Sequence, residues 1–261
     1  IEKPPAWNRR YKAFTKGTIT PIKSGLAEPP KNQLIARGPG ESYANVGYMD
    51  HQIGRVLKTL KKLRLEGSTL VVFASDNGPV TSQWLNWWEV NAYGSTDGLR
   101  GRKHLLYEGG IKVPAIVRYP GRIEANTVSD ELIVGTDLFT TIATAAGVPI
   151  PSDREIDGLD VWPALNGASL SPRALLWALE GQPAPPYAWR EGDWKLMLNA
   201  DFSVAGLYDL ETDPNELFDL ASSEPTRTQN MQERFEVRLN RIMNDPLRKL
   251  SLRERSLHAS Q

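Results

Sequence analysis

The spacing of apolar residues predicts a long amphipathic helix in the first third of the chain. Between Val46 and Leu63, apolar side chains recur at steps of three and four residues, which places them on one face of a helix. Lys61 and Lys62 fall mostly on the other side, and Gly67 is a suitable stop because glycine readily ends a helix. The pattern therefore predicts a helix that ends shortly before Gly67.

A continuous apolar run, rather than an alternating one, follows at residues 69–75. Such continuity is typical of a strand covered on both faces, as in parallel α/β sheets. Further strands are predicted at residues 115–119 and 131–134, and a helix at residues 137–146 after the potential N-cap Thr136. Helix and buried strand thus alternate over residues 1–165, which predicts an α/β fold.

The pattern changes in residues 166–261, where short strand candidates come close together. The segment 191–193, Glu-Gly-Asp, has the composition of a hairpin turn, and Pro225 is well placed to open an amphipathic helix. We therefore expect a small antiparallel subdomain with a terminal helix, and a first part, residues 1–165, that forms an α/β domain. The strand candidates are residues 174–179, 187–190, 194–198 and 205–210.

Composition narrows the classes of partner. Lys and Arg number 31 and Asp and Glu number 31, so the formal net charge is zero. A balanced charge argues against bulk attraction to nucleic acid or to an anionic membrane, and we expect neither as a partner. Cysteine is absent, which excludes disulfides, a thiolate nucleophile and a zinc–thiolate site within this sequence.

Two oxygen-bearing side chains follow the most apolar strand. In open α/β sheets, ligands collect at the carboxyl ends of strands, and Asp76 and Asn77 stand at that position. Carboxylate and amide oxygens are the donors that calcium and magnesium prefer. The alternative is a tight turn, because Asp-Asn-Gly is also a common turn sequence and two ligands are few for a calcium ion, which takes about 6–8.

A basic stretch lies further along the chain at residues 99–104, Leu-Arg-Gly-Arg-Lys-His. Lys103 and His104 could hold a tetrahedral anion through charge-assisted hydrogen bonds, which makes both candidate substrate-binding residues. The alternative is a solvated surface loop, since basic clusters are common on protein surfaces.

Aromatic side chains crowd the polar segment between these two motifs. Trp84, Trp87, Trp88 and Tyr93 could stack on a sugar ring or an aryl group, because rigid rings bury a large area at low entropic cost. We take Trp87 and Trp88 as candidate substrate-binding residues. A satellite hydrophobic cluster beneath the loop is the alternative.

Seven short segments follow one another along the chain: residues 75–79, Ser-Asp-Asn-Gly-Pro; 99–103, Leu-Arg-Gly-Arg-Lys; 107–110, Tyr-Glu-Gly-Gly; 136–141; 157–160; 189–196; and 207–216. Taken in order, these motifs resemble the sulfatase family, which belongs to the alkaline-phosphatase-like superfamily. The resemblance implies a mixed sheet flanked by helices, followed by a small antiparallel sheet with a helix. It also implies hydrolysis of a sulfuric ester, on a sulfated carbohydrate or an aryl sulfate.

By this resemblance, Asp76 and Asn77 would be two ligands of a calcium ion. Lys103 would be the catalytic residue of this segment, contacting the sulfate and stabilising charge on the bridging or leaving oxygen. Arg100 would brace its loop rather than touch substrate. His104 stands where the family often has glycine, so it would add a cation beside the sulfate or alter the loop.

The resemblance also implies that parts of the site are missing. The family nucleophile is a formylglycine made from Cys or Ser in a C/S-x-P-x-R motif. The chain has no cysteine, and we expect no Ser-x-Pro-x-Arg motif, because residues 171–173, Ser-Pro-Arg, lack both its spacing and its location. The other calcium aspartates, a second lysine and two histidines are expected upstream of Ile1.

We therefore expect an incomplete second half of a sulfatase, inactive alone, that needs its N-terminal half and acts on a sulfated small molecule or glycan. By family, the protein would be periplasmic, extracellular or lysosomal. Two alternatives stay open: a non-catalytic fragment or binding module, and a phosphonate or phosphodiester hydrolase of the same superfamily.

Overall fold

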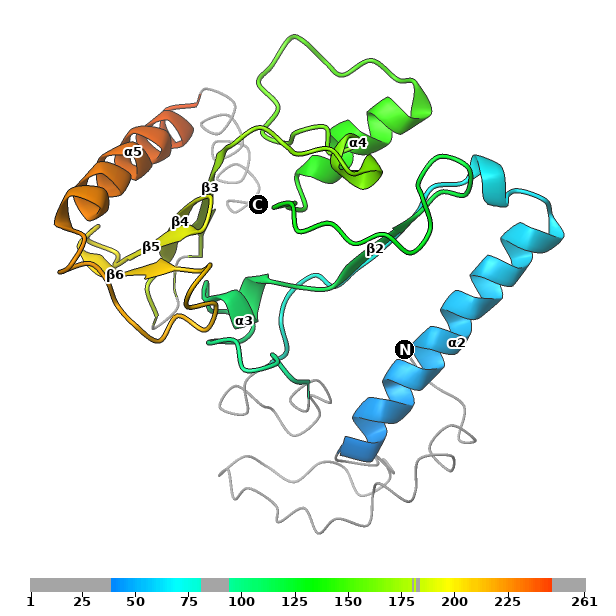
Figure 1. The fold of residues 1–261 in the computed structure, drawn as a ribbon, viewed down its shortest axis with the longest axis horizontal. Coiled ribbons are helices and arrows are strands. Elements are labelled where there is room, and N and C mark those ends of the chain that lie inside the picture. The colour runs from blue at the N-terminus through cyan, green and yellow to red at the C-terminus, as the bar shows by residue number, and fades with distance from the viewer. Residues whose placement is uncertain (1–38, 81–93, 180, 182–183, 246–261) are drawn as a thin grey trace, which may run out of the picture. The chain divides into compact units, whose positions relative to one another are not determined.

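The computed structural model describes residues 39–80, 94–179, 181 and 184–245 (Figure 1). The chain divides into two compact units. The first unit comprises residues 1–97 and 110–171, and the second comprises residues 98–109 and 172–261. The segment 98–109, hereafter the basic loop, thus belongs to the C-terminal unit although it lies in the middle of the first predicted domain.

The predicted long helix forms α2 (Pro39–Lys62), with Lys61 and Lys62 in its last turn, where cations stabilise the helix dipole. A short 3-10 turn, η2 (Glu66–Ser68), follows it. The apolar side chains of α2 remain largely exposed among the described residues: Val46 is 55% exposed and Val56 is 57% exposed. The helix therefore forms as predicted, and its apolar face is only partly covered, with Ile53, Leu57 and Leu60 half-buried. No described helix is long and apolar enough to cross a membrane.

The apolar run at residues 69–75 forms β1 (Val71–Ala74), which pairs with β2 (Ala115–Arg118). The pairing is antiparallel, with Val71 opposite Arg118, and Ile116 is 63% exposed. The prediction of a parallel, doubly covered strand is therefore wrong for the described part of the chain. An apolar run indicates which side chains favour burial, but it carries no information about the direction of the neighbouring strand.

The third strand predicted in this unit, at residues 131–134, does not form. Its last residue, Val134, is hydrogen-bonded instead to Asp137, the first residue of the next helix. The backbone N–H of Val134 donates to Asp137 Oδ2 at 2.8 Å. Asp137 opens α4 (Asp137–Ala146), which ends as predicted at Gly147 in the left-handed conformation, φ 68°. The side chain of Thr136, at the N-cap position, accepts no capping hydrogen bond from the helix. The Asp137 carboxylate instead accepts backbone N–H groups from outside the helix, those of Val134 and Leu159.

The second unit contains the predicted antiparallel sheet. Its strands are β3 (Ala174–Ala178), β4 (Tyr187–Glu191), β5 (Trp194–Leu198) and β6 (Val204–Asp209), hydrogen-bonded in that order. The helix opened by Pro225 is α5 (Pro225–Met243). Two short elements complete the described chain: α3 (Glu108–Ile111) and the 3-10 turn η5 (Ala164–Asn166).

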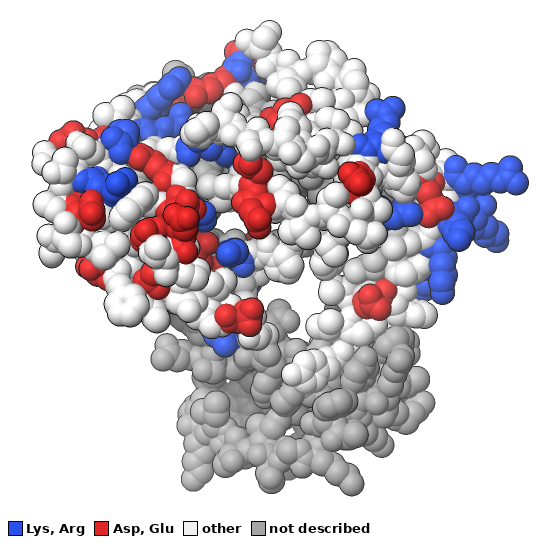
Figure 2. All heavy atoms as spheres, in the orientation of Figure 1, with Lys and Arg blue, Asp and Glu red and all other residues white. Residues whose placement is uncertain are grey.

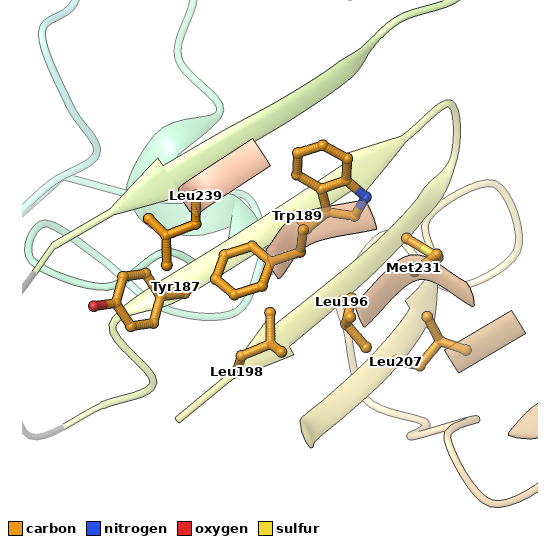
Figure 3. Packing of buried hydrophobic residues seen from close by; sticks show 8 residues of the cluster. Tyr187, Trp189, Leu196, Leu198, Leu207, Met231 and Leu239 are labelled. Carbon is orange, nitrogen blue, oxygen red and sulfur yellow. The ribbon is translucent and has the colours of Figure 1, made fainter. Parts of the chain in front are cut away.

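Helix α5 packs on one face of this sheet and forms its hydrophobic core (Figure 3). Phe235 is fully buried, and its ring centroid lies 5.5 Å from that of Tyr187 and 6.4 Å from that of Trp189. Side chains alternate between the faces of a strand, so Leu196 and Leu198 point toward α5 while Lys195 and Met197 point to the opposite face. Lys195 and Met197 are also fully buried, so both faces of β5 are covered.

Acidic and basic side chains are intermixed over the sheet and α5 on the face shown in Figure 2. Toward the right edge of the same view, Lys and Arg side chains gather with few acidic neighbours.

Candidate functional site

The candidate metal ligands lie in a turn that leaves β1. The Oγ of Ser75 donates to the backbone oxygen of Asn77 at 3.0 Å, and Asn77 Nδ2 donates to the backbone oxygen of Gly78 at 2.9 Å. The turn is tied to the rest of the first unit by the N–H of Gly78, which donates to Gly110 O at 2.9 Å. Asp76 is exposed and Asn77 is half-buried.

These two residues have the ligand atoms that a hard cation prefers, but two ligands are too few to hold one. A carboxylate and an amide oxygen are suitable calcium ligands, whereas calcium takes about 6–8 oxygen atoms. The described residues contain no group of three or more His, Cys, Asp or Glu side chains that could hold a metal ion. Asp76 and Asn77 could therefore supply two ligands of a larger set.

The basic loop is closed on itself by its last residue. The N–H of Gly109 donates to Arg100 O at 2.7 Å, and a Cβ at position 109 would lie 2.5–2.7 Å from the carbonyl oxygens of Leu99, Arg100 and Gly101. Only glycine permits this approach. The backbone of the loop is therefore closely packed where Gly109 meets these carbonyl groups.

Lys103 and His104 occupy the tip of a tight turn in this loop. The N–H of Leu105 donates to Arg102 O at 2.9 Å, which makes Lys103 and His104 the two central residues. His104 has a φ of 71°, the left-handed conformation that favours glycine. Both side chains are half-buried. The position where the resemblance implies glycine thus has a glycine-like backbone, although it carries a histidine.

Arg100 braces the basic loop from within the second unit. Its guanidinium lies 4.0 Å from the ring centroid of Tyr107, and Nη1 donates to the hydroxyl of Tyr208 at 3.0 Å and to the backbone oxygen of Glu216 at 2.8 Å. Burial raises the pKa of Tyr107, and the charge of Arg100 opposes that rise. These contacts occupy the guanidinium with protein groups.

A buried charge cluster beside the loop was not predicted from the sequence. Lys195 Nζ lies 2.8 Å from Glu108 Oε1 and 2.9 Å from Glu216 Oε1, and the Lys195 and Glu216 side chains are fully buried. Burial raises the pKa of Glu216, and the ammonium of Lys195 opposes the rise. A lysine that alternates with apolar residues in a strand is ordinarily assigned to a solvent face, so its burial could not be predicted from the strand pattern.

The candidate aromatic residues lie outside the described part of the chain, and the other candidates belong to different units. Trp84, Trp87, Trp88 and Tyr93 lie outside the described residues, so stacking on a sugar or aryl ring stays a prediction. Asp76 and Asn77 belong to the first unit and Lys103 to the second. Their convergence on one ligand is accordingly part of the functional proposal.

The expectation that the chain contains no Ser-x-Pro-x-Arg motif is wrong, because residues 223–227, Ser-Glu-Pro-Thr-Arg, have that spacing. It forms the start of α5, where the Oγ of Ser223 donates to Leu220 O at 3.0 Å. The Arg227 guanidinium lies 4.0 Å from the ring centroid of Trp194. These contacts give the segment a structural role, so the expectation of a missing nucleophile rests on location and not on spacing.

Comparison with known families identifies the chain. The sulfatase family model matches residues 4–148, more than half of the sequence. The chain belongs to the sulfatase family. A second model, the C-terminal region of N-sulphoglucosamine sulphohydrolase, matches residues 101–245. The two matches overlap over residues 101–148, which include Lys103 and His104.

Individual relatives agree with this membership. Steryl-sulfatase of Homo sapiens is 41% identical over 122 residues, 46% of this chain and 21% of that protein. N-acetylgalactosamine-6-sulfatase of Canis lupus familiaris is 40% identical over 129 residues, 49% of this chain and 24% of that protein. The chain therefore matches about a quarter or less of the length of these curated relatives.

Solved structures show the same fold. BT4656, solved in complex with its substrate D-glucosamine-2-N,6-O-disulfate, superposes with a TM-score of 0.59 at 25% identity, covering 78% of this chain and 40% of that one. The fold is thus α/β, of the alkaline-phosphatase-like class, as the resemblance implied.

Proposed function

We propose that this sulfatase-family chain supplies part of the active site of an enzyme that hydrolyses a sulfuric ester on a carbohydrate or an aryl alcohol. The observation that supports it is the position of Lys103 at the tip of a closed, braced loop, within the overlap of both family matches. A braced loop presents its tip in a fixed place, which is what recognition of a small tetrahedral anion requires.

In this proposal, the ammonium of Lys103 donates charge-assisted hydrogen bonds to sulfate oxygens and stabilises the negative charge that develops on the leaving oxygen. His104, the next residue in the turn, adds a second donor. Asp76 and Asn77 provide two oxygen ligands for calcium. When bound, the ion would polarise the sulfate oxygens.

The names of the relatives suggest the substrate class. Those relatives are a steryl-sulfatase, an N-acetylgalactosamine-6-sulfatase and a protein bound to a disulfated glucosamine. We propose a sulfated carbohydrate or aryl sulfate for this protein as well. The formylglycine nucleophile and the remaining calcium ligands would come from sequence outside these 261 residues, so these residues alone would be inactive.

The test is an assay of the full-length gene product with calcium, on a chromogenic aryl sulfate and on sulfated mono- and oligosaccharides. Lys103→Met should lower kcat/KM by about 10²–10³, the effect of removing one donor to developing negative charge. Lys112→Met, a change to an exposed lysine, is the matched control and should leave the rate unchanged.

Two results would reject the proposal. The first is cleavage of phosphate or phosphonate esters without turnover of any sulfate, which would indicate a phosphonate or phosphodiester hydrolase. The second is a Lys103→Met rate equal to that of wild type. Loss of activity in the 261-residue chain alone, with activity in the full-length product, is the expected outcome for an incomplete site.

A further inference from the structure

Three polar side chains form a row across the sheet on the face opposite α5. Strand register places Arg190 opposite Lys195, and Lys195 opposite Tyr208, on three neighbouring strands. Residues directly opposite each other in a sheet project from the same face. Each member of the row contacts a side chain of the basic loop.

Two of these contacts converge on Glu108. Lys195 Nζ lies 2.8 Å from Glu108 Oε1, and Arg190 Nη1 lies 3.5 Å from Glu108 Oε2. The third joins the Tyr208 hydroxyl to Arg100 Nη1 at 3.0 Å. Both ends of the basic loop are therefore held to the same row, Arg100 at one end and Glu108 at the other.

Glu216 holds the loop from a second direction. Its Oε2 accepts the backbone N–H of Glu108 at 2.7 Å, and its Oε1 lies 2.9 Å from Lys195 Nζ. Glu216 Oε1 has no hydrogen bond of good geometry among the described residues, so the ammonium of Lys195 is what balances its charge. Glu216 itself has a φ of 54°, and the Asp213 carboxylate fixes the following turn by accepting the N–H of Leu217 at 2.7 Å.

A buried ion cluster is a poor way to gain stability alone. Well-packed apolar residues of similar volume often stabilise a fold as well or better, because they avoid the desolvation of charges. Ion pairs and hydrogen bonds differ from apolar contacts in being directional, so several together allow one register of the loop on the sheet. The cluster of Lys195, Glu108 and Glu216 is thus suited to holding a geometry.

We propose that Lys195, Glu108 and Glu216 form an anchor that fixes the basic loop on the C-terminal sheet and so positions Lys103 and His104. The three are positioning residues, and none of them touches substrate. That the position of Lys103 and His104 matters for catalysis rests on the proposed function. The attachment of the basic loop to the sheet can be tested without any measurement of activity.

The first experiment measures loop opening in the full-length gene product. Lys195→Met should speed amide exchange at Glu108 and Gly109, and trypsin cleavage at Arg100, Arg102 and Lys103, by at least tenfold, while Leu196 and Leu207 keep their protection. The matched control is Leu239→Ala, which weakens the α5 side of the same sheet without touching the loop. It should not open the loop selectively.

If Lys195→Met does not fold, Glu108→Gln provides the same test, since it keeps the shape of the side chain and leaves Lys195 paired with Glu216. Wild-type loop exchange in a folded Lys195→Met protein, or in Glu108→Gln where the former does not fold, would overturn the anchor.

The second experiment measures kcat and KM of the same variants on a sulfate ester. A displaced Lys103 loses transition-state contacts, so kcat should fall at least tenfold in the anchor variants with a smaller change in KM. Lys195→Arg should recover part of that loss. Absence of sulfate hydrolysis in the wild-type protein would reject the proposed function, whereas unchanged kcat in a variant with an opened loop would reject the positioning role.

Discussion

The ammonium nitrogen of Lys195 lies 2.8 Å from a carboxylate oxygen of Glu108, although 87 residues separate the two in the chain. This contact joins strand β5 to the end of the basic loop. It explains why residues 98–109 form one compact unit with the C-terminal sheet and not with the sequence on either side of them.

The core beneath α5 provides a matched pair of substitutions on one helix. Phe235 is fully buried, so Phe235→Ala should lower the free energy of unfolding by about 3–5 kcal/mol. Val237 is 71% exposed, and Val237→Ala should change the free energy by no more than about 0.5 kcal/mol. Chemical denaturation followed by tryptophan fluorescence would measure both, and equal effects would contradict the packing of α5.

The closure of the basic loop depends on glycine at position 109, because a larger residue would collide with the loop backbone. Gly109→Ala places a Cβ within 2.7 Å of three carbonyl oxygens, so the loop must shift and the free energy of unfolding should fall by about 1–3 kcal/mol. Gly54→Ala is the control, because nothing lies within 4 Å of its Cβ and alanine favours the helix by about 1 kcal/mol. Thermal melts should move in opposite directions for the two variants.

The Glu191–Arg234 pair should make stability depend on pH in acid. Burial raises the pKa of Glu191, but hydrogen bonds from Arg234 and Trp189 outweigh it and hold the pKa below 4.5. A lowered native pKa adds stability above the unfolded value, which is lost as pH falls through the native value. Arg234→Met should therefore cost about 0.5–1 kcal/mol at neutral pH and nothing once Glu191 is protonated.

A double-mutant cycle serves as the control for that pair. In a Glu191→Gln background, Arg234→Met should have no effect at any pH, since the charge it pairs with is gone. A pH-independent effect of Arg234→Met in the wild-type background would show that its packing, and not its charge, is what stabilises the fold.

Calcium binding should depend on the turn after β1. Asp76→Ala should weaken calcium affinity of the full-length gene product at least tenfold, a loss of about 1.4 kcal/mol, because it removes an anionic ligand. Asp130→Ala removes the same charge from an exposed loop of the same unit and is the control. Calorimetric titration that gives equal affinities for the two variants would reject Asp76 as a ligand.

The motif at residues 223–227 should have no catalytic role. Ser223→Ala should leave sulfate hydrolysis within about twofold of wild type, since its Oγ serves Leu220 O and a surface hydrogen bond contributes little. Mass spectrometry of the peptide that contains Ser223 should find an unmodified serine. An aldehyde at this position, with loss of activity in Ser223→Ala, would make it the nucleophile instead.

Periodicity and turn chemistry alone were enough to predict most elements. The helix at residues 137–146, its end at Gly147, the strands of the C-terminal sheet and the start of α5 at Pro225 all follow from local preferences, which act over a few residues and are therefore legible in the sequence. Family membership was recognisable for a similar reason, because ordered short motifs carry it.

Contacts between distant segments were decided only by the tertiary structure. The antiparallel pairing of β1 with β2 and the loss of the strand at 131–134 to Asp137 both depend on partners that apolar spacing does not name. The burial of Lys195 is the clearest case. Its place in β5 predicts a solvent-facing lysine, and two carboxylates, one 87 residues before it in the chain and one beyond β6, keep its charge stable in the interior.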